Sequence, residues 1–171
     1  LGNLKQQQPD WRADAGPVVV IGAGGGGRAV CYALLQQGAT EIRLVNRTAA
    51  HANAIAEEFG GPIQVLPWDE RHDALEGAFM AVNVTSQGMV GEPALDIRLD
   101  KLSDSALVTD IIYTPLESPF LAAARARGNR TINGLGMLLH QGPPAWKFWF
   151  GLEPTVTAEL RERMEQSLAG V

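Results

Sequence analysis

The chain lacks most of the features that mark extracellular, membrane-bound or nucleic-acid-binding proteins. Its single cysteine, Cys31, cannot form an internal disulfide, which excludes a disulfide-stapled secreted module and favours a reducing compartment, the cytoplasm. The three histidines are scattered, so we expect no metal site. Acidic residues outnumber basic ones by 19 to 14 and no basic block occurs, so bulk charge does not favour nucleic acid or an anionic membrane as a partner. No apolar run approaches the roughly 18 residues of a spanning helix, and the first residues lack the layout of a signal peptide.

What is present is enough apolar sequence for one core, arranged as alternating strand and helix patterns. Hydrophobic residues make up 46% of the 171 positions, enough for a single domain over residues 1–171. Short apolar or β-branched runs predict strands at 17–21, 41–45, 63–66, 79–84 and 107–112. Apolar residues three and four apart predict helices at 28–37, 49–59, 118–127 and, beyond about residue 134, towards the C-terminus, with a weaker pattern at 70–75. The alternation predicts an α/β fold with a doubly wound parallel sheet and flanking helices.

A glycine-rich loop lies directly between the first predicted strand and the first predicted helix. Gly22, Gly24 and Gly27 form the pattern GxGxxG within residues 22–27. In such a loop the first glycine allows a tight turn, the second lets the backbone approach a pyrophosphate, and the third lets helix and strand pack closely. The helix N-terminus then offers unpaired N–H groups to the phosphates. The loop and its position predict a Rossmann-like fold that binds a dinucleotide.

The residues after the second predicted strand indicate which dinucleotide binds. NAD sites usually carry an acid about 20 residues beyond the glycines, whereas an NADP site needs a cation for the 2′-phosphate. This chain has Asn46-Arg47-Thr48 at that point and no acid. Arg47 can pair with the phosphate, and Thr48 can cap the next helix while offering a hydroxyl. The alternative is that Arg47 is only a surface charge and Thr48 only a cap; we favour NADP.

With these motifs in place, the sequence strongly resembles the shikimate dehydrogenase family. The resemblance also rests on motifs at residues 83–89, 110–115 and 134–141, in the family's order and spacing across nearly the whole chain. It implies that the cofactor is contacted by Gly22, Ala23, Gly24, Gly25, Gly26, Asn46, Arg47, Thr48, His51, Thr85, Ser86, Ile111, Gly134 and Met137. It implies that Tyr113 and Gln141 contact the substrate. Most of these residues follow predicted strands, so we expect them at the carboxyl edge of the sheet, where such folds bind ligands.

The resemblance also implies an activity, together with a part that we do not find in this chain. The family reduces 3-dehydroshikimate to shikimate with NADPH, on the chorismate route to aromatic amino acids. Ketone reduction needs a donor that stabilises or protonates the oxygen, and in the family a lysine and an aspartate of a separate N-terminal substrate domain do this. None of the three lysines here, Lys5, Lys101 and Lys147, lies in a matching motif, and no Tyr-xxx-Lys pair is present. We therefore expect the N-terminal substrate domain to be absent, Leu1 to lie at a cut edge, and the chain to bind cofactor without turnover.

Two features leave alternatives open. His51 stands where the family commonly has arginine or lysine. Because histidine is only partly charged at neutral pH, we expect an NADP preference that is less strict and depends on pH, unless His51 is simply an exposed helix residue. Aromatic residues cluster at 146–150, where we expect packing between the last two helices; the alternative is an exposed surface that normally meets the missing domain or self-associates. Two other functions remain possible, namely a quinate or shikimate dehydrogenase that accepts NAD, and a non-catalytic nucleotide-binding module.

Overall fold

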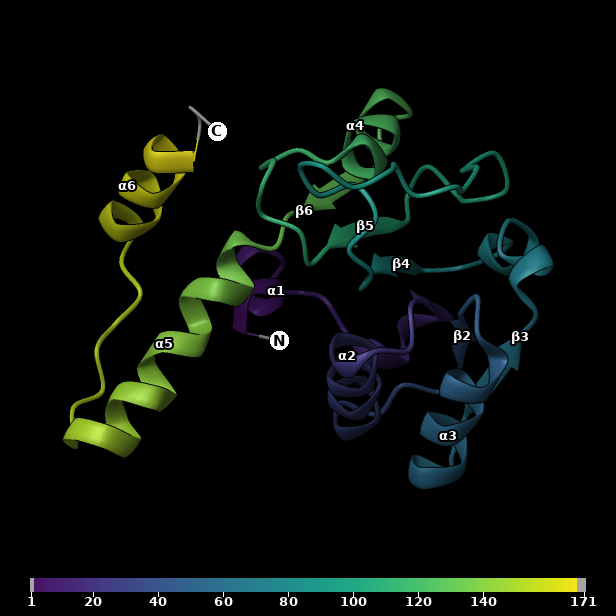
Figure 1. The fold of residues 1–171 in the computed structure, drawn as a ribbon, viewed down its shortest axis with the longest axis horizontal. Coiled ribbons are helices and arrows are strands. Elements are labelled where there is room, and N and C mark those ends of the chain that lie inside the picture. Colours follow the sequence, from purple (N-terminus) through teal and green to yellow (C-terminus); the bar gives the residue numbers. More distant parts are fainter. Residues whose placement is uncertain (1, 169–171) are drawn as a thin grey trace.

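A parallel sheet of six strands forms the centre of the computed structural model, which describes residues 2–168 (Figure 1). The strands run in the spatial order β3-β2-β1-β4-β5-β6, which is the order of a doubly wound sheet, and every neighbouring pair is parallel. Their bounds are β1 Val18–Ile21, β2 Ile42–Val45, β3 Ile63–Leu66, β4 Met80–Asn83, β5 Leu107–Asp110 and β6 Arg130–Ile132. The predicted fold class is confirmed.

Helices and turns cover the sheet on both faces. On one face, α2 (Gly25–Gln36) and α3 (Ala49–Phe59) share a core with α1 (Gly2–Gln7). On the other face, α4 (Pro119–Ala126) packs together with the 3₁₀ turn Asp73–Leu75 and the loop that precedes β5. Strand β1 contributes alternate residues to the two cores, which is why its four side chains are all apolar and fully buried.

Some elements differ from the sequence-based expectations. Helix α2 begins at Gly25, three residues before the expected start, because the glycine loop itself enters the first turn. The weak helical pattern at 70–75 forms two 3₁₀ turns, Trp68–Glu70 and Asp73–Leu75, and the turn Ala13–Ala15 precedes β1. Neither α1 nor β6 was expected. Helix α1 is mostly polar, and β6 is a three-residue edge strand with a single buried side chain.

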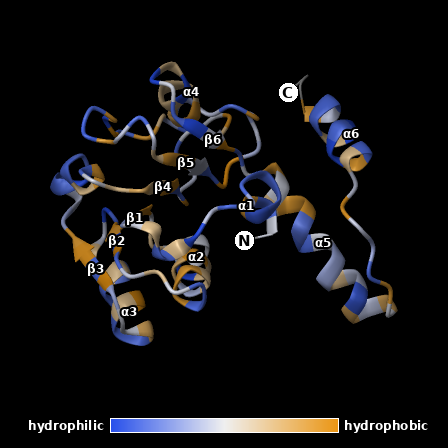
Figure 2. Cartoon of the chain, turned by 180° about the vertical axis from the view of Figure 1, so that it is seen from behind, coloured by the Kyte–Doolittle hydropathy of each residue, from blue (hydrophilic) through white to orange (hydrophobic). Residues whose placement is uncertain are grey.

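The two C-terminal helices extend away from the sheet (Figure 1). They are α5 (Leu135–Phe150), whose first turns pack on α1, and α6 (Ala158–Leu168), which is largely hydrophilic (Figure 2) and has no buried residue. The expected packing of the aromatic cluster between these helices is wrong: Phe148 is 85% exposed and Trp149 69% exposed. Within residues 2–168, no helix is long and apolar enough to cross a membrane.

Candidate functional site

A cavity of about 260 Å³ opens at the carboxyl ends of β1, β2 and β4. The strand order reverses between β1 and β4, which is where open α/β sheets bind ligands. The cavity gathers seven of the residues that the sequence singles out: Gly22, Ala23, Gly24, Asn46, Arg47, Thr85 and Ser86. It also contains Gln87, from the motif at residues 83–89, and Trp68, which sequence reasoning missed. Trp68 reaches the site from the connection after β3, and no motif marks it.

Each glycine of the loop has the conformation or the space that its predicted role needs. Gly22 has φ 115°, and a Cβ there would lie 2.8 Å from Cγ2 of Thr85. A Cβ on Gly27 would overlap the carbonyl oxygen of Gly22, so only glycine lets α2 approach β1 this closely. By contrast, nothing lies within 4 Å of a Cβ built on Gly24 or Gly25, which leaves their backbone open to a ligand. Helix α2 starts at Gly25 and directs its first N–H groups to this opening.

Asn46 joins the glycine loop to the loop after β2. Its Oδ1 accepts a hydrogen bond from the N–H of Ala23 at 3.0 Å, and its Nδ2 donates to the carbonyl of Thr48 at 2.8 Å. Arg47, between these two anchors, is exposed and lines the cavity. Thr48 occupies the N-cap position of α3, but its hydroxyl makes no capping hydrogen bond, so the predicted side-chain cap is wrong. The loop is therefore fixed while its cationic side chain faces solvent.

His51 lies in a neighbouring cavity of about 330 Å³ between the glycine loop and α3. This cavity shares Ala23 and Gly24 with the first one and is also lined by Gly25 and Arg28. His51 is exposed, and its N–H donates to the carbonyl of Thr48 at 3.1 Å. The structure thus places His51 beside the loop but in a different cavity from Arg47.

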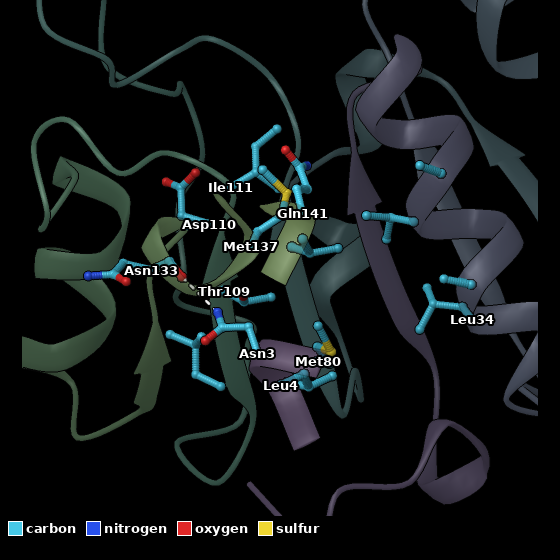
Figure 3. A pocket seen from close by; sticks show the side chains of 16 residues that line it. Asn3, Leu4, Leu34, Met80, Thr109, Asp110, Ile111, Asn133, Met137 and Gln141 are labelled. Atoms are coloured by element: carbon cyan, nitrogen blue, oxygen red, sulfur yellow. Dashed lines mark hydrogen bonds between the residues drawn. The ribbon is translucent and has the colours of Figure 1, made fainter. Parts of the chain in front are cut away.

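A third cavity, of about 230 Å³, lies between α2 and α5 and reaches under the end of β5 (Figure 3). Ile111, Gly134, Met137 and Gln141 all line it, and in Figure 3 Ile111, Met137 and Gln141 are grouped at one end. Gly134 is required there, because a Cβ would overlap the carbonyl oxygen of Ile111. The lining is mostly apolar, with Leu34 and Met80 deeper in, as suits a planar ring.

The remaining predicted residues border this region. A Cβ on Gly26 would lie 3.3 Å from Cδ1 of Ile111, so the glycine loop abuts the third cavity. Tyr113 follows β5 in the same loop as Ile111 and is half-buried, but it does not line the cavity. Gln141 does line it and is exposed.

A buried polar network that sequence reasoning missed fixes the loops after β4 and β5. Asn83 and Asp110 end these adjacent strands in register, and Nδ2 of Asn83 donates to Oδ1 of Asp110 at 3.1 Å. Oδ1 of Asn83 accepts from the N–H and the hydroxyl of Thr85, at 3.0 and 2.7 Å. Asp110 accepts from the N–H of Ile112 at 3.0 Å and from the hydroxyl of Ser118 at 2.6 Å. The network therefore connects Thr85, on the dinucleotide side, with the segment that carries Ile111 and Tyr113.

Asp110 is 1% exposed, and this burial raises the pKa of its carboxyl above the usual range. Hydrogen bonds from Ser118, Ile112 and Asn83 act in the opposite direction by stabilising the carboxylate. Ser118 is also the N-cap of α4, because its Oγ accepts a hydrogen bond from the N–H of Leu121 at 3.3 Å.

The strand order, the glycine loop and the cavities at the carboxyl edge define a Rossmann-type dinucleotide-binding domain. The family model described as shikimate / quinate 5-dehydrogenase matches residues 4–112, which is more than half of the chain. The chain belongs to this family, as its motifs predicted.

Relatives of known name and known structure agree with this assignment. The shikimate dehydrogenase (NADP(+)) of Rhodospirillum rubrum is 54% identical over 94% of this chain and 58% of that protein. The structure of quinate dehydrogenase from Corynebacterium glutamicum in complex with NAD has a TM-score of 0.83 and 29% identity, over 99% of this chain and 59% of that one. Shikimate 5-dehydrogenase from Thermus thermophilus in complex with NADP(H) and shikimate has a TM-score of 0.72 and 35% identity, over 91% and 55%. The chain therefore spans less than two thirds of the length of these relatives.

Proposed function

We propose that this chain is the NADP-binding domain of a shikimate dehydrogenase, which reduces 3-dehydroshikimate to shikimate with NADPH on the route to chorismate and aromatic amino acids. The observation that carries the proposal is the placement of Arg47, a cation that lines the first cavity from a loop fixed by the two hydrogen bonds of Asn46. A 2′-phosphate is the feature of NADP that needs such a cation. The relative from Rhodospirillum rubrum, whose name specifies NADP(+), supports the same choice.

In this proposal the first and third cavities hold the two ends of one cofactor, which supplies the hydride, and the second cavity, with His51, adjoins the 2′-phosphate end. The backbone of residues 22–26 and the first N–H groups of α2 bind the pyrophosphate. Asn46, Arg47 and Thr48 bind the 2′-phosphate end, with Thr85 and Ser86 on the opposite wall. The nicotinamide ring lies against Ile111, Gly134 and Met137, which exclude water from one side of it. Gln141, exposed at this cavity, and Tyr113, on the adjoining loop, face the substrate.

We propose that the group which protonates the substrate oxygen comes from outside this chain. Lys101 pairs with Asp73 at 2.8 Å and Lys147 with Glu153 at 2.7 Å, and neither lysine lines the third cavity. Lys5, on α1, does not line it either. The resemblance to the family assigns the proton-donating lysine and aspartate to an N-terminal substrate domain, and relatives are long enough to include one, since this chain spans 58% of the Rhodospirillum rubrum protein.

The exposed end of α5 supports a contact with that domain. Trp146, Phe148, Trp149 and Phe150 are 49%, 85%, 69% and 62% exposed and lie on a helix that extends beyond the sheet. Clustered exposed aromatic side chains are typical of an interaction surface.

A cytoplasmic location is consistent with the free thiol of Cys31, whose pKa burial raises to about 11.

Fluorescence titration of the purified chain with NADPH and NADH tests the cofactor. We expect NADPH to bind at least tenfold more tightly, because a charge-assisted hydrogen bond to phosphate contributes about 1.5–3 kcal/mol. Arg47→Gln should remove this preference, whereas Arg163→Gln on α6, an exposed arginine in a pair with Glu159, should not. Equal affinities for the two cofactors would favour the alternative, a quinate or shikimate dehydrogenase that accepts NAD.

A steady-state assay with shikimate and NADP tests the catalytic part of the proposal. We expect no turnover by the chain alone, because the proton donor is not part of it. Adding the purified N-terminal part of a relative should restore turnover if the two parts associate. Turnover by the chain alone contradicts the proposed source of the proton donor, and binding of neither cofactor contradicts the dinucleotide site itself.

A further inference from the structure

Arg28 lies at the edge of the dinucleotide site but belongs to none of the motifs discussed above. It is in the first turn of α2 and lines the second cavity together with Gly24, Gly25 and His51. This cavity shares Ala23 and Gly24 with the cavity that contains Arg47. The Arg28 side chain therefore borders the space between the pyrophosphate loop and α3, next to the place where the 2′-phosphate is proposed to bind.

The guanidinium of Arg28 is paired with an acid that faces solvent. Both of its terminal nitrogens donate to the carboxylate of Glu58, near the end of α3, and its central carbon lies 5.4 Å from the centre of the Phe59 ring. The side chains of Arg28 and Glu58 are 53% and 42% exposed. Exposed ion pairs of this kind are weak because water screens them, so the guanidinium can exchange partners at little cost.

The geometry of α3 places the present partner of Arg28 and the cavity on one side of the helix. His51 and Glu58 are seven residues apart, which is two helical turns, or about 10 Å along the axis. Arg28 lines the cavity near His51 and contacts Glu58 at the other end of this span. The cavity and the carboxylate of Glu58 are therefore both within reach of this one side chain.

We propose that Arg28 is a second specificity-determining residue for the 2′-phosphate, held by Glu58 in the free protein and transferred to the phosphate when NADP binds. This inference rests on the proposed function. A phosphate dianion offers three acceptor oxygens and binds a guanidinium in the same two-pronged manner as a carboxylate, but with more charge. Arg28 thus supplies a second guanidinium beside Arg47, from the cavity that it lines together with His51.

Two variants with opposite expected effects test the proposal, with NADPH and NADH as probes and with 2′,5′-ADP and 5′-AMP as probes that lack the nicotinamide. Arg28→Gln should weaken NADPH and 2′,5′-ADP roughly tenfold and leave NADH and 5′-AMP unchanged. Glu58→Gln should tighten NADPH and 2′,5′-ADP severalfold, because it removes the competing acid, and again leave the other two unchanged. Arg163→Gln and Glu159→Gln, the two halves of an exposed pair on α6, are matched controls and should change none of the four affinities.

The proposal is overturned if Arg28→Gln weakens all four ligands equally, which would indicate a pyrophosphate or structural role, or if it weakens none. It is also overturned if Glu58→Gln leaves the preference for 2′-phosphate ligands unchanged. Thermal unfolding of each variant separates loss of binding from loss of fold. If Arg47→Gln abolishes the 2′-phosphate preference while Arg28→Gln does not, only the role of Arg28 is lost and the proposed function stands. If the wild-type chain shows no such preference, both fail.

Discussion

Ser118→Ala is a sharp test of the buried network, because one hydroxyl serves two partners there. The Ser118 hydroxyl donates to Oδ2 of Asp110 at 2.6 Å and accepts from the N–H of Leu121 at 3.3 Å, and the residue is fully buried. Loss of an N-cap costs roughly 1 kcal/mol, and loss of a hydrogen bond to a charged group costs about 1.5–3 kcal/mol. We therefore expect the free energy of unfolding to fall by roughly 2–4 kcal/mol, which lowers the melting temperature by about 5–15 °C in a domain of this size.

Urea unfolding at several pH values separates the two contributions. The loss of the cap should be the same at every pH. The loss at Asp110 should be largest where the carboxyl is ionised and should shrink in acid, where the protonated carboxyl no longer needs the donor. Ser105→Ala removes an exposed hydroxyl whose hydrogen bond is to the hydroxyl of Ser103, at 2.9 Å, and as a control it should change stability by less than about 0.5 kcal/mol.

A double-mutant cycle with Asp110→Asn decides whether the two residues interact as the structure indicates. We expect Ser118→Ala to cost less in the Asp110→Asn background than in the wild type, with a coupling of about 1 kcal/mol or more. The reasoning is refuted if Ser118→Ala stays within 0.5 kcal/mol of the wild type at neutral pH, or if its cost is the same in both backgrounds.

Three further predictions concern the loop, the buried acid and the exposed aromatics. Gly27→Ala should destabilise the fold by roughly 1–3 kcal/mol and abolish NADPH binding, because its Cβ overlaps the carbonyl oxygen of Gly22. Gly24→Ala, whose Cβ has nothing within 4 Å, should weaken NADPH binding alone, and equal melting temperatures for the two variants would contradict this. Burial raises the folded-state pKa of Asp110, so its contribution to stability is fully present below its unfolded pKa of about 4 and is lost as pH rises through the higher folded value. In urea unfolding, Asp110→Asn should therefore flatten the dependence of the unfolding free energy on pH, and an unchanged dependence would count against this reasoning. Trp149→Ser, at a side chain 69% exposed, should change the free energy of unfolding by less than about 0.5 kcal/mol and, in sedimentation, weaken the proposed association with the N-terminal part of a relative. A loss above about 2 kcal/mol would show that this side chain packs within the chain.

The parts of the fold that local patterns determine were predictable. Strand β1 is a β-branched run that ends at glycine, and burial on both faces explains why its pattern is continuous rather than alternating. Helix α1 and strand β6 were not predictable, because they depend on tertiary contacts. Asn3 of α1 is buried and donates to the carbonyl of Asn133 at 3.1 Å, a contact between residues 130 positions apart that no local pattern indicates.

The candidate site shows the same division. The glycine loop, Asn46 and Arg47 could be located because each follows a strand, and strand ends of one parallel sheet meet at one edge. The pairing of Asn83 with Asp110 requires the register between β4 and β5, which the sequence alone does not specify. The aromatic residues of α5 were expected to pack between the last two helices because large apolar side chains are usually buried, but Phe148 and Trp149 are exposed, which agrees with the alternative of an exposed surface.

The most direct test of the central claim is a crystal structure of this chain with NADP bound. The account predicts the pyrophosphate on the backbone of residues 22–26, the 2′-phosphate paired with Arg47, and the nicotinamide ring against Ile111, Gly134 and Met137. A cofactor whose 2′-phosphate contacts neither Arg47 nor Arg28, or whose nicotinamide lies outside the cavity between α2 and α5, would contradict it.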